Sequence, residues 1–244
     1  AAAAAMLAQT AAATEAAETV QSELTVIWLH SAESQHLINS MGPGGRSLLE
    51  LWKASWEPQE NGAYCAPASA VAALRLLKFP SASAWNQTRI FNEVLQPLGL
   101  FTAGVSLEHG ARMMQGLGAG ELLVEERCIL DPVEAEAKLH DDLRAAFGEE
   151  QGSAPPTCIL ANYRRWVPGR GGGHWSPLGG WSEKYRMVLI LETNSQKCRP
   201  HWVPVSDLVK AICEWNRATA RPRGYVVVQR SPANNGATAF QSDC

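Results

Sequence analysis

The stretch Gln59-Glu-Asn-Gly-Ala-Tyr-Cys65-Ala-Pro-Ala-Ser-Ala70 places a cysteine directly before an apolar segment that continues to Leu77. Pro67 suits the first turn of a helix, where its missing N–H costs nothing. Apolar residues then recur with the i, i+3, i+4, i+7 spacing of one helix face, at Ala70, Ala73, Leu74 and Leu77. The sequence therefore predicts that Cys65 lies at the N-terminus of a buried helix.

A cysteine in that position is a candidate nucleophile. The positive end of the helix dipole stabilises a thiolate, which is the form of cysteine that attacks carbonyl groups. A lone cysteine beside an apolar helix is, however, more often a small core residue. The choice between these interpretations depends on a second group that accepts the thiol proton.

The stretch Arg170-Gly-Gly-Gly-His174-Trp-Ser-Pro-Leu-Gly-Gly-Trp181 supplies such a group. Histidine is the usual general base for a thiol nucleophile, and the glycines before it let the backbone approach a ligand. A predicted strand over 186–193 follows, and near its end Glu192 and Asn194 share one face. Either side chain can orient the His174 ring, so both remain candidates. Cysteine, then histidine, then acid or amide is the papain-type order.

The composition narrows the function classes. The chain has 244 residues, of which 46% are hydrophobic and 18% charged, as in an ordinary globular enzyme. Its net charge of −3 provides no basic field for nucleic acid. No apolar run approaches the roughly 20 residues of a membrane span, so we expect no membrane partner.

The six cysteines contain no C-x-x-C pair, which argues against structural zinc and redox motifs and predicts no protein metal site. Their wide, irregular spacing is not typical of a disulfide framework. We therefore expect a reducing, cytoplasmic location.

The chain divides into an Ala-rich flexible tail over 1–22, one catalytic domain over 23–230 and a polar C-terminal tail over 231–244. The first half is mainly helical, with two helices split by Gly42-Pro43-Gly44-Gly45. The second half is mainly an antiparallel sheet, which predicts an α+β fold. Arg164-Arg165 is interpreted as a solvent-exposed pair. Further expected helices cover 106–117, 131–147 and 206–215; expected strands cover 121–128, 157–163, 173–181, 186–193 and 224–230.

Taken together, these stretches resemble the phytochelatin synthases, which are papain-like γ-glutamylcysteine dipeptidyl transpeptidases. Four motifs, in the family's order and at its spacing, carry the resemblance over residues 24–230. They are Gln59-Glu-Asn-Gly-Ala-Tyr-Cys-Ala-Pro-Ala-Ser69, Gly171-Gly-Gly-His-Trp-Ser-Pro-Leu-Gly-Gly-Trp181, Leu189-Ile-Leu-Glu192 followed by Pro200-His-Trp-Val-Pro204, and Arg223-Gly-Tyr-Val-Val227. The resemblance implies a papain-like cysteine protease fold.

The resemblance also implies a role for each matched residue. Cys65 would attack the Cys–Gly bond of glutathione and release glycine, with His174 as the base. Gln59 would donate a hydrogen bond in an oxyanion hole. Arg223 would bind a carboxylate of the γ-glutamyl group through its planar guanidinium. The γ-glutamylcysteinyl thioester would then pass to a second glutathione or to water.

Several positions depart from the family's pattern. The triad aspartate is Glu192 here, and the glycine after the nucleophile is Ala66. An arginine three residues past the triad acid is replaced by Ser195, which would favour hydrolysis over transfer, whereas Lys197 is kept as a candidate substrate-binding residue. The acid that accompanies the late arginine falls on Asn216, which loses a charge at the substrate site.

The resemblance implies the short form of these enzymes, without their Cys-rich C-terminal domain, and a possible homodimer. No cofactor would be bound by the protein, because cadmium or zinc would enter as a metal–glutathione thiolate substrate. Two alternatives remain open. One is a papain-like peptidase that acts on other substrates. The other is a catalytically impaired protein that binds glutathione or metal thiolates.

Overall fold

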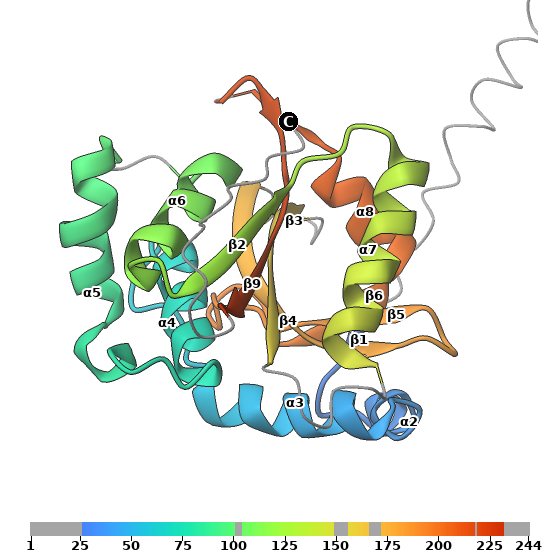
Figure 1. Ribbon diagram of the computed structural model, residues 1–244. Helices are drawn as coiled ribbons and strands as arrows, with labels where there is room; N and C mark the ends of the chain where they lie inside the picture. Colours follow the sequence, from blue (N-terminus) through green and yellow to red (C-terminus); the bar gives the residue numbers. More distant parts are fainter. Residues whose placement is uncertain (1–25, 101–103, 149–155, 166–171, 218, 232–244) are drawn as a thin grey trace, which may run out of the picture.

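The computed structural model describes residues 26–100, 104–148, 156–165, 172–217 and 219–231, and the expected N-terminal tail and nearly all of the C-terminal tail lie outside them. Helices dominate the first half of these residues and strands the second half (Figure 1). In chain order they are β1 (Ile27–Trp28), α2 (Ala32–Asn39), α3 (Pro43–Ser55), α4 (Cys65–Leu76), η1 (Ala82–Ala84), α5 (Gln87–Ile90), η2 (Phe91–Leu95), η3 (Gln96–Leu98), α6 (Leu107–Gly118), β2 (Leu122–Arg127), α7 (Pro132–Phe147), β3 (Thr157–Arg165), β4 (Gly172–Ser182), β5 (Met187–Ile190), β6 (His201–Pro204), α8 (Val205–Ile212), β7 (Trp215–Asn216), β8 (Arg221–Pro222) and β9 (Gly224–Arg230).

Seven of the described strands form one antiparallel sheet in the order β1-β6-β5-β4-β3-β9-β2. The long strand β4 connects the two halves of this sheet. Residues 172–177 pair with β3, whereas Leu178 to Ser182 pair with β5, and the register shifts between Leu178 and Gly180. Such an irregularity bends a strand and increases its twist. Within the described chain, the first half of β4 therefore has one edge that no strand covers.

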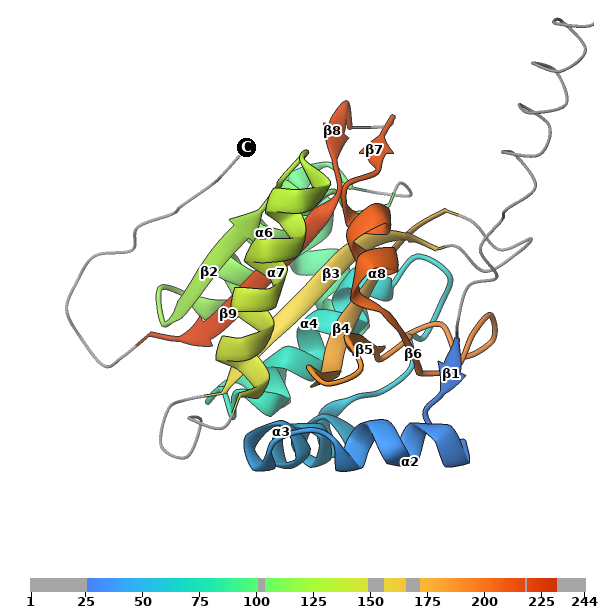
Figure 2. The ribbon, with the colours of Figure 1, turned by 90° about the vertical axis from the view of Figure 1, so that its right-hand side faces the viewer.

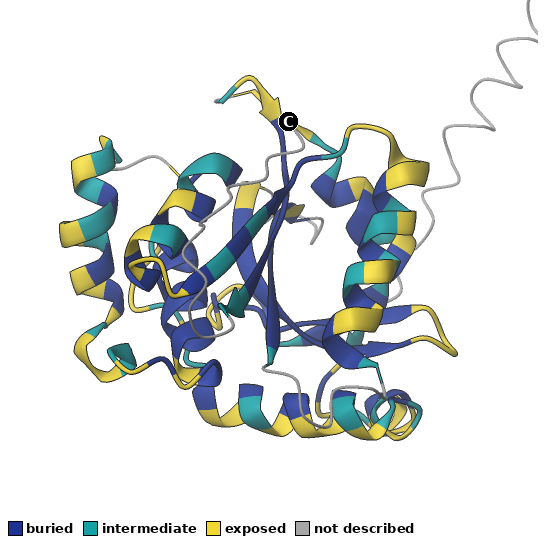
Figure 3. Ribbon diagram, viewed as in Figure 1, coloured by how far each residue is buried: buried dark blue, intermediate teal, exposed yellow. Residues whose placement is uncertain are grey.

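Helices cover both faces of this sheet. Helices α4 and α6 lie on one side and α7 and α8 on the other, while α3 passes beneath the sheet (Figures 1 and 2). Helix α4 packs on β4, α6 on β2 and β9, and α7 and α8 on β3. Figure 3 shows that the buried residues follow the sheet and the helix surfaces that face it. The core thus holds elements from both halves of the sequence in contact.

Helix α4 is the central helix of the core. Every residue from Cys65 to Leu74 is buried, and Arg75 is the first exposed position. A helix that is apolar on all sides belongs in the interior, and its many alanines allow close approach to the sheet. The Ser69 hydroxyl donates to the Cys65 carbonyl at 2.8 Å, so this polar side chain is satisfied within the helix. The predicted helix and the predicted position of Cys65 are confirmed.

The α+β class is confirmed as well, and two cap residues behave as expected. Ser106 accepts a hydrogen bond from the His109 N–H, and Asp131 accepts from the Val133 and Glu134 N–H groups. These bonds satisfy backbone donors that a helix N-terminus otherwise leaves open.

The two helices expected on either side of Gly42-Pro43-Gly44-Gly45 are found, but the break between them is shorter than expected, because α3 starts at Pro43 and includes both later glycines. A side chain at Gly45 would lie 3.0 Å from the Phe147 carbonyl where α7 ends, so glycine allows this close approach. Two strands also differ from the prediction. The strand expected over 186–193 already ends at Ile190. Strand β6, which the sequence pattern did not predict, pairs with β5 over four residues.

Four described cysteines carry free thiols, at positions 65, 158, 198 and 213. Cys128, in contrast, is disulfide-bonded. The expectation that the cysteines are reduced is therefore wrong at this position, because chain spacing does not reveal which thiols meet in three dimensions. None of the helices in the described ranges is both long and apolar enough to cross a membrane.

Two glycines of α6 provide a test of the packing on β4. A methyl group at Gly110 would lie 2.4 Å from the Trp175 ring, whereas at Gly116 the nearest side-chain atom is 4.0 Å away. We expect Gly110→Ala to lower the free energy of unfolding by about 1–3 kcal/mol through overpacking. Gly116→Ala should be neutral or stabilise by up to about 1 kcal/mol, because alanine favours a helix. Urea unfolding measures both, and equal effects would contradict this packing.

Candidate active site

Cys65 is the first residue of α4 and is 8% exposed. Its thiol interacts with the His174 side chain and with the backbone N–H groups of Trp175 and Ala66. The Trp175 N–H belongs to the first half of β4, on the edge that β3 does not use. The helix N-terminus therefore meets the sheet at this open edge, and the thiol lies beside the predicted base.

His174 and Glu192 form a buried pair. His174 is 2% exposed and Glu192 is fully buried, and His174 Nε2 hydrogen-bonds Glu192 Oε1. The two residues meet as the sequence predicted, although Glu192 reaches His174 from the loop after β5 and not from a paired strand. Because a carboxylate only accepts hydrogen bonds, His174 Nε2 carries a proton in this pair. The lone pair of the neutral ring is then on Nδ1, which the Arg165 guanidinium contacts.

The structure also separates the roles of Glu192 and Asn194. The two residues do not share a strand face, because β5 ends at Ile190 and both lie in the following loop. The Asn194 backbone N–H donates to Glu192 Oε1 at 2.7 Å, while its side-chain oxygen accepts from the Lys197 N–H at 3.2 Å. Glu192 thus contacts the histidine, and the Asn194 side chain caps the turn that follows.

Arg165 is a residue that the sequence interpretation missed. It is 8% exposed, and its guanidinium contacts His174 Nδ1 and lies 3.3 Å (Nε) from Glu192 Oε2. The predicted solvent-exposed pair is therefore wrong for Arg165, although Arg164 is exposed and pairs with Glu214. The strand was expected to end at Tyr163, so the period-2 alternation that places Tyr163 and Arg165 on one face was not applied to Arg165.

The electrostatics of the site favour an ion pair between thiolate and imidazolium. Burial by itself raises the pKa of the Cys65 thiol, but the hydrogen bond and charge of His174 outweigh it, and the net pKa is lowered. Burial likewise acts to lower the pKa of His174, yet its bonds to Cys65 and Glu192 raise it overall. The pKa of Glu192 is lowered despite burial, because His174 and Arg165 stabilise its charge.

Gln59 lies in the same network through Thr193. The Gln59 backbone N–H donates to the Thr193 carbonyl at 2.8 Å, and the Thr193 hydroxyl donates to Gln59 Oε1 at 3.2 Å. The same hydroxyl lies 3.3 Å from His174 Nε2. Thr193 therefore links Gln59, the predicted oxyanion donor, to His174, the predicted base. No sequence motif indicated this residue, because it lies in a loop.

Arg223 packs against Gly173, the residue directly before His174. It is 9% exposed, and a side chain at Gly173 would overlap its guanidinium at 2.5 Å. Its Nη1 donates a long hydrogen bond of 3.4 Å to Asn162, and its Nε has no partner among the described residues. Burial lowers the pKa of Arg223, because the charge is only weakly compensated. A buried cation with unused donors is suited to bind a carboxylate.

The other two predicted substrate-binding residues lie further out. Asn216 is half-buried in the β7–β8 hairpin, opposite Arg221, and the preceding Glu214 carbonyl accepts the Arg223 N–H at 3.1 Å. Lys197 is exposed in the turn after Glu192. The hairpin thus connects Asn216 to Arg223, whereas the Lys197 N–H bonds Asn194 in the turn after Glu192.

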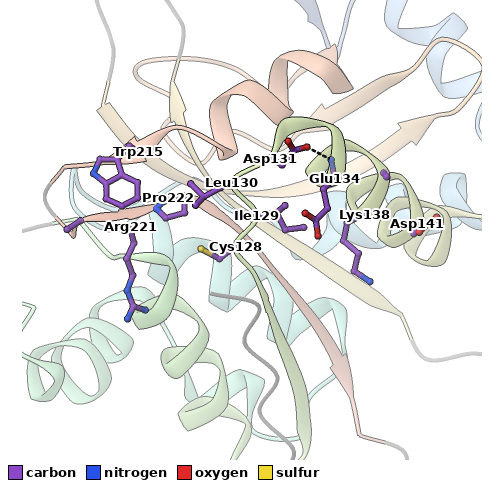
Figure 4. A pocket seen from close by; sticks show the side chains of 12 residues that line it. Cys128, Ile129, Leu130, Asp131, Glu134, Lys138, Asp141, Trp215, Arg221 and Pro222 are labelled. Carbon is purple, nitrogen blue, oxygen red and sulfur yellow. Dashed lines mark hydrogen bonds between the residues drawn. The ribbon is translucent and has the colours of Figure 1, made fainter.

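A separate open pocket of about 950 Å³ lies between the β7–β8 hairpin and the start of α7 (Figure 4). Its walls include Cys128, Leu130 and Trp215, with Asp131 capping the helix beside them. Neither the Cys65 thiol nor the triad residues line it. This pocket is therefore distinct from the site at Cys65. No cluster of three or more metal-ligating side chains occurs in the described ranges.

A thiol at a helix N-terminus, beside an imidazole oriented by a carboxylate, is the side-chain set of thiol-dependent acyl transfer and hydrolysis. A family model described as "Phytochelatin synthase" matches residues 18–225. The chain belongs to the phytochelatin synthase family, as its motifs predicted.

Named relatives agree with that family. The chain is 28% identical over 201 residues to glutathione gamma-glutamylcysteinyltransferase 3 of Lotus japonicus, which covers 79% of this chain and 40% of that protein. It is 28% identical over 184 residues to glutathione gamma-glutamylcysteinyltransferase 1 of Arabidopsis thaliana, covering 72% and 36%. For glutathione gamma-glutamylcysteinyltransferase 1 of Triticum aestivum the identity is 27% over 213 residues, covering 82% and 40%. The chain thus spans about two fifths of the length of these relatives.

The lowered pKa of Cys65 can be tested by alkylation with iodoacetamide across pH, followed by peptide mass spectrometry. We expect Cys65 to react below the ordinary thiol pKa of about 8.5 and to lose reactivity only as pH falls through its depressed value. Glu192→Gln removes a charge that stabilises the imidazolium, so it should move the midpoint to higher pH.

His174→Ala should return the midpoint to the ordinary value or above it, because the counter-ion is removed. Cys158→Ser is the matched control, since the thiol of this fully buried cysteine has a raised pKa and no role in the pair. A wild-type midpoint near 8.5 would refute the ion pair.

Proposed function

We propose that the protein cleaves the Cys–Gly peptide bond of glutathione through a thioester on Cys65. The observation that supports this best is the buried arrangement of Cys65, His174 and Glu192 within a chain of the phytochelatin synthase family. A papain-like fold is part of the proposal, because the helix that carries the thiol precedes the strand that carries the histidine along the chain, as in that class.

In the first half-reaction, the Cys65 thiolate attacks the carbonyl carbon of the glutathione cysteine. The backbone N–H of the nucleophile and the Gln59 amide are proposed to stabilise the oxyanion. As the intermediate collapses, the C–N bond breaks, the His174 imidazolium donates its proton to the leaving amine, and glycine departs. The γ-glutamylcysteinyl group remains on Cys65 as a thioester.

In the second half-reaction, neutral His174 removes a proton from the attacking group. Attack by the amino group of a second glutathione lengthens the peptide by one γ-glutamylcysteine unit, whereas attack by water releases free γ-glutamylcysteine. In both cases the C–S bond breaks and the thiolate of Cys65 is regenerated. Ser195, which is exposed beside the triad, provides no cation for a second glutathione, so we propose that hydrolysis competes strongly.

Recognition of the γ-glutamyl group is assigned to Arg223. Its guanidinium is buried, borders the glycines before His174 and keeps an unused donor in the described structure. Asn216 on the adjacent hairpin and Lys197 in the turn after the triad are proposed to complete the substrate site. Cadmium or zinc is proposed to enter as a thiolate complex with glutathione, since soft thiolates prefer such ions.

Cytoplasmic location and a homodimer remain predictions. The two alternatives, a peptidase for other substrates and a catalytically impaired binding protein, are not favoured by any described contact. The impaired-protein alternative rests on Glu192, Ala66 and Asn216, and of these Glu192 reaches His174 in a hydrogen-bonded arrangement.

The direct test is mass spectrometry of the intact protein after mixing with glutathione, with and without cadmium. We expect an adduct of γ-glutamylcysteine on Cys65, free glycine in solution, and neither in the Cys65→Ser control. Soluble γ-glutamylcysteine would then indicate hydrolysis, and longer peptides would indicate transfer. An absence of both adduct and glycine would refute the proposed activity.

The role of Arg223 is tested by Arg223→Met, with Arg230→Met at the far end of the strand that follows it as a control. Loss of a charge-assisted contact worth about 1.5–3 kcal/mol should raise KM for glutathione roughly 10- to 100-fold and change kcat less. Arg230 lies at the far end of β9, opposite Leu122, so its replacement should leave both constants unchanged. Equal effects of the two substitutions would rule out recognition by Arg223.

A further inference from the structure

Thr193 makes more contacts within the active site than its loop position suggests. The residue is fully buried, and its hydroxyl lies 3.2 Å from Gln59 Oε1, 3.2 Å from the Trp175 carbonyl and 3.3 Å from His174 Nε2. Its backbone carbonyl accepts the Gln59 N–H at 2.8 Å. One side chain therefore touches the proposed oxyanion donor, the base and the edge of β4 that holds Cys65.

The surrounding acceptors determine how the Gln59 amide is oriented. Its nitrogen Nε2 lies 2.5 Å from the Asn61 carbonyl, which can only accept a hydrogen bond, so the NH₂ end must face Asn61. The oxygen Oε1 then faces the Thr193 hydroxyl at 3.2 Å and is able to accept its proton. Among the described residues Asn61 is the one acceptor of this NH₂ group, which leaves its second hydrogen for a substrate oxygen.

The hydroxyl of Thr193 carries a single proton with two possible acceptors at equal distance, the Trp175 carbonyl and Gln59 Oε1. The third neighbour, His174 Nε2, is a donor, because its proton is shared with the Glu192 carboxylate. Donation to Gln59 restrains the amide, whereas donation to Trp175 releases it. The hydroxyl thus controls the freedom of Gln59 without taking part in the proton transfer between Cys65 and His174.

We propose that Thr193 is a positioning residue for the oxyanion donor, because its hydroxyl holds the Gln59 amide with the NH₂ group turned toward the reacting carbonyl. This inference rests on the proposed function. It goes further in naming a residue that acts through Gln59 rather than through the thiol or its base.

The test compares Thr193→Val, which removes the hydroxyl at nearly constant shape, with Thr193→Ser, which keeps it. Three measurements separate the possible roles: kcat and KM for glycine release from glutathione, the rate of Cys65 acylation by p-nitrophenyl acetate, and the pH profile of Cys65 alkylation by iodoacetamide. Acylation forms an oxyanion and does not need glutathione recognition. Alkylation depends on the thiolate and forms no oxyanion.

We expect Thr193→Val to lower kcat and the acylation rate about three- to tenfold, less than the roughly 10²- to 10³-fold cost of losing an entire oxyanion donor. KM and the alkylation midpoint should not change, and Thr193→Ser should restore both rates. In a Gln59→Ala background, Thr193→Val should cause no further loss, because the two residues act as one unit.

An unchanged acylation rate in Thr193→Val would overturn the inference. So would a shifted alkylation midpoint, which would place the effect at His174, or losses that multiply with Gln59→Ala. If the wild-type protein is acylated by p-nitrophenyl acetate but does not cleave glutathione, the proposed substrate is wrong and the Thr193 comparison still decides the inference. If neither substrate acylates Cys65, both proposals fail.

Discussion

The buried contact between His174 and Glu192 is the constraint on which the rest of the site depends. Removing a carboxylate from water costs several kcal/mol even after the protein relaxes, and this cost is offset only by close, well-oriented partners. Glu192 has such partners on every side: the His174 ring, the Arg165 guanidinium at 3.3 Å and the Asn194 N–H at 2.7 Å. The Tyr163 hydroxyl adds a longer bond of 3.4 Å. Because Tyr163 and Arg165 lie on β3 and His174 lies on β4, the charge ties these two strands to the loop after β5.

The open edge of β4 explains how a helix from the first half of the chain joins this network. At Trp175, the backbone N–H interacts with the Cys65 thiol and the carbonyl accepts from the Thr193 hydroxyl. The N–H and C=O of one residue in an antiparallel strand point to the same side, so a single uncovered position serves both groups. If β5 extended along this half of β4, these two groups would be used in strand pairing and the thiol would lose its place. The register shift at Gly180 is therefore part of the site's construction.

Glu192 reaches His174 from a position that follows the end of β5. A residue in a regular strand has its Cβ direction set by the pleat, and an added methylene would carry the carboxylate past its target. In the loop the backbone is free of that alternation, and the Asn194 N–H holds one carboxylate oxygen. Arg165 balances the charge on the opposite side, so the histidine is not the only cation that Glu192 faces. The electrostatic environment of the proposed base thus depends on Arg165, a residue outside the proposed set of Cys65, His174 and Glu192.

The helix that starts at Cys65 and the strand that carries His174 could be predicted from the sequence, as could a polar residue near the end of the next strand as its partner. These features follow from local periodicity, from glycine and proline signals and from motif order, which neighbouring residues encode. The three-dimensional packing was needed to show that Glu192 rather than Asn194 contacts the histidine, that Arg165 is buried beside it, and that Thr193 joins Gln59 to His174. Those facts depend on where β3 and β5 end and on how strongly β4 bends. A strand's end and twist are set by the packing of helices from both halves of the chain, and no local pattern specifies that packing.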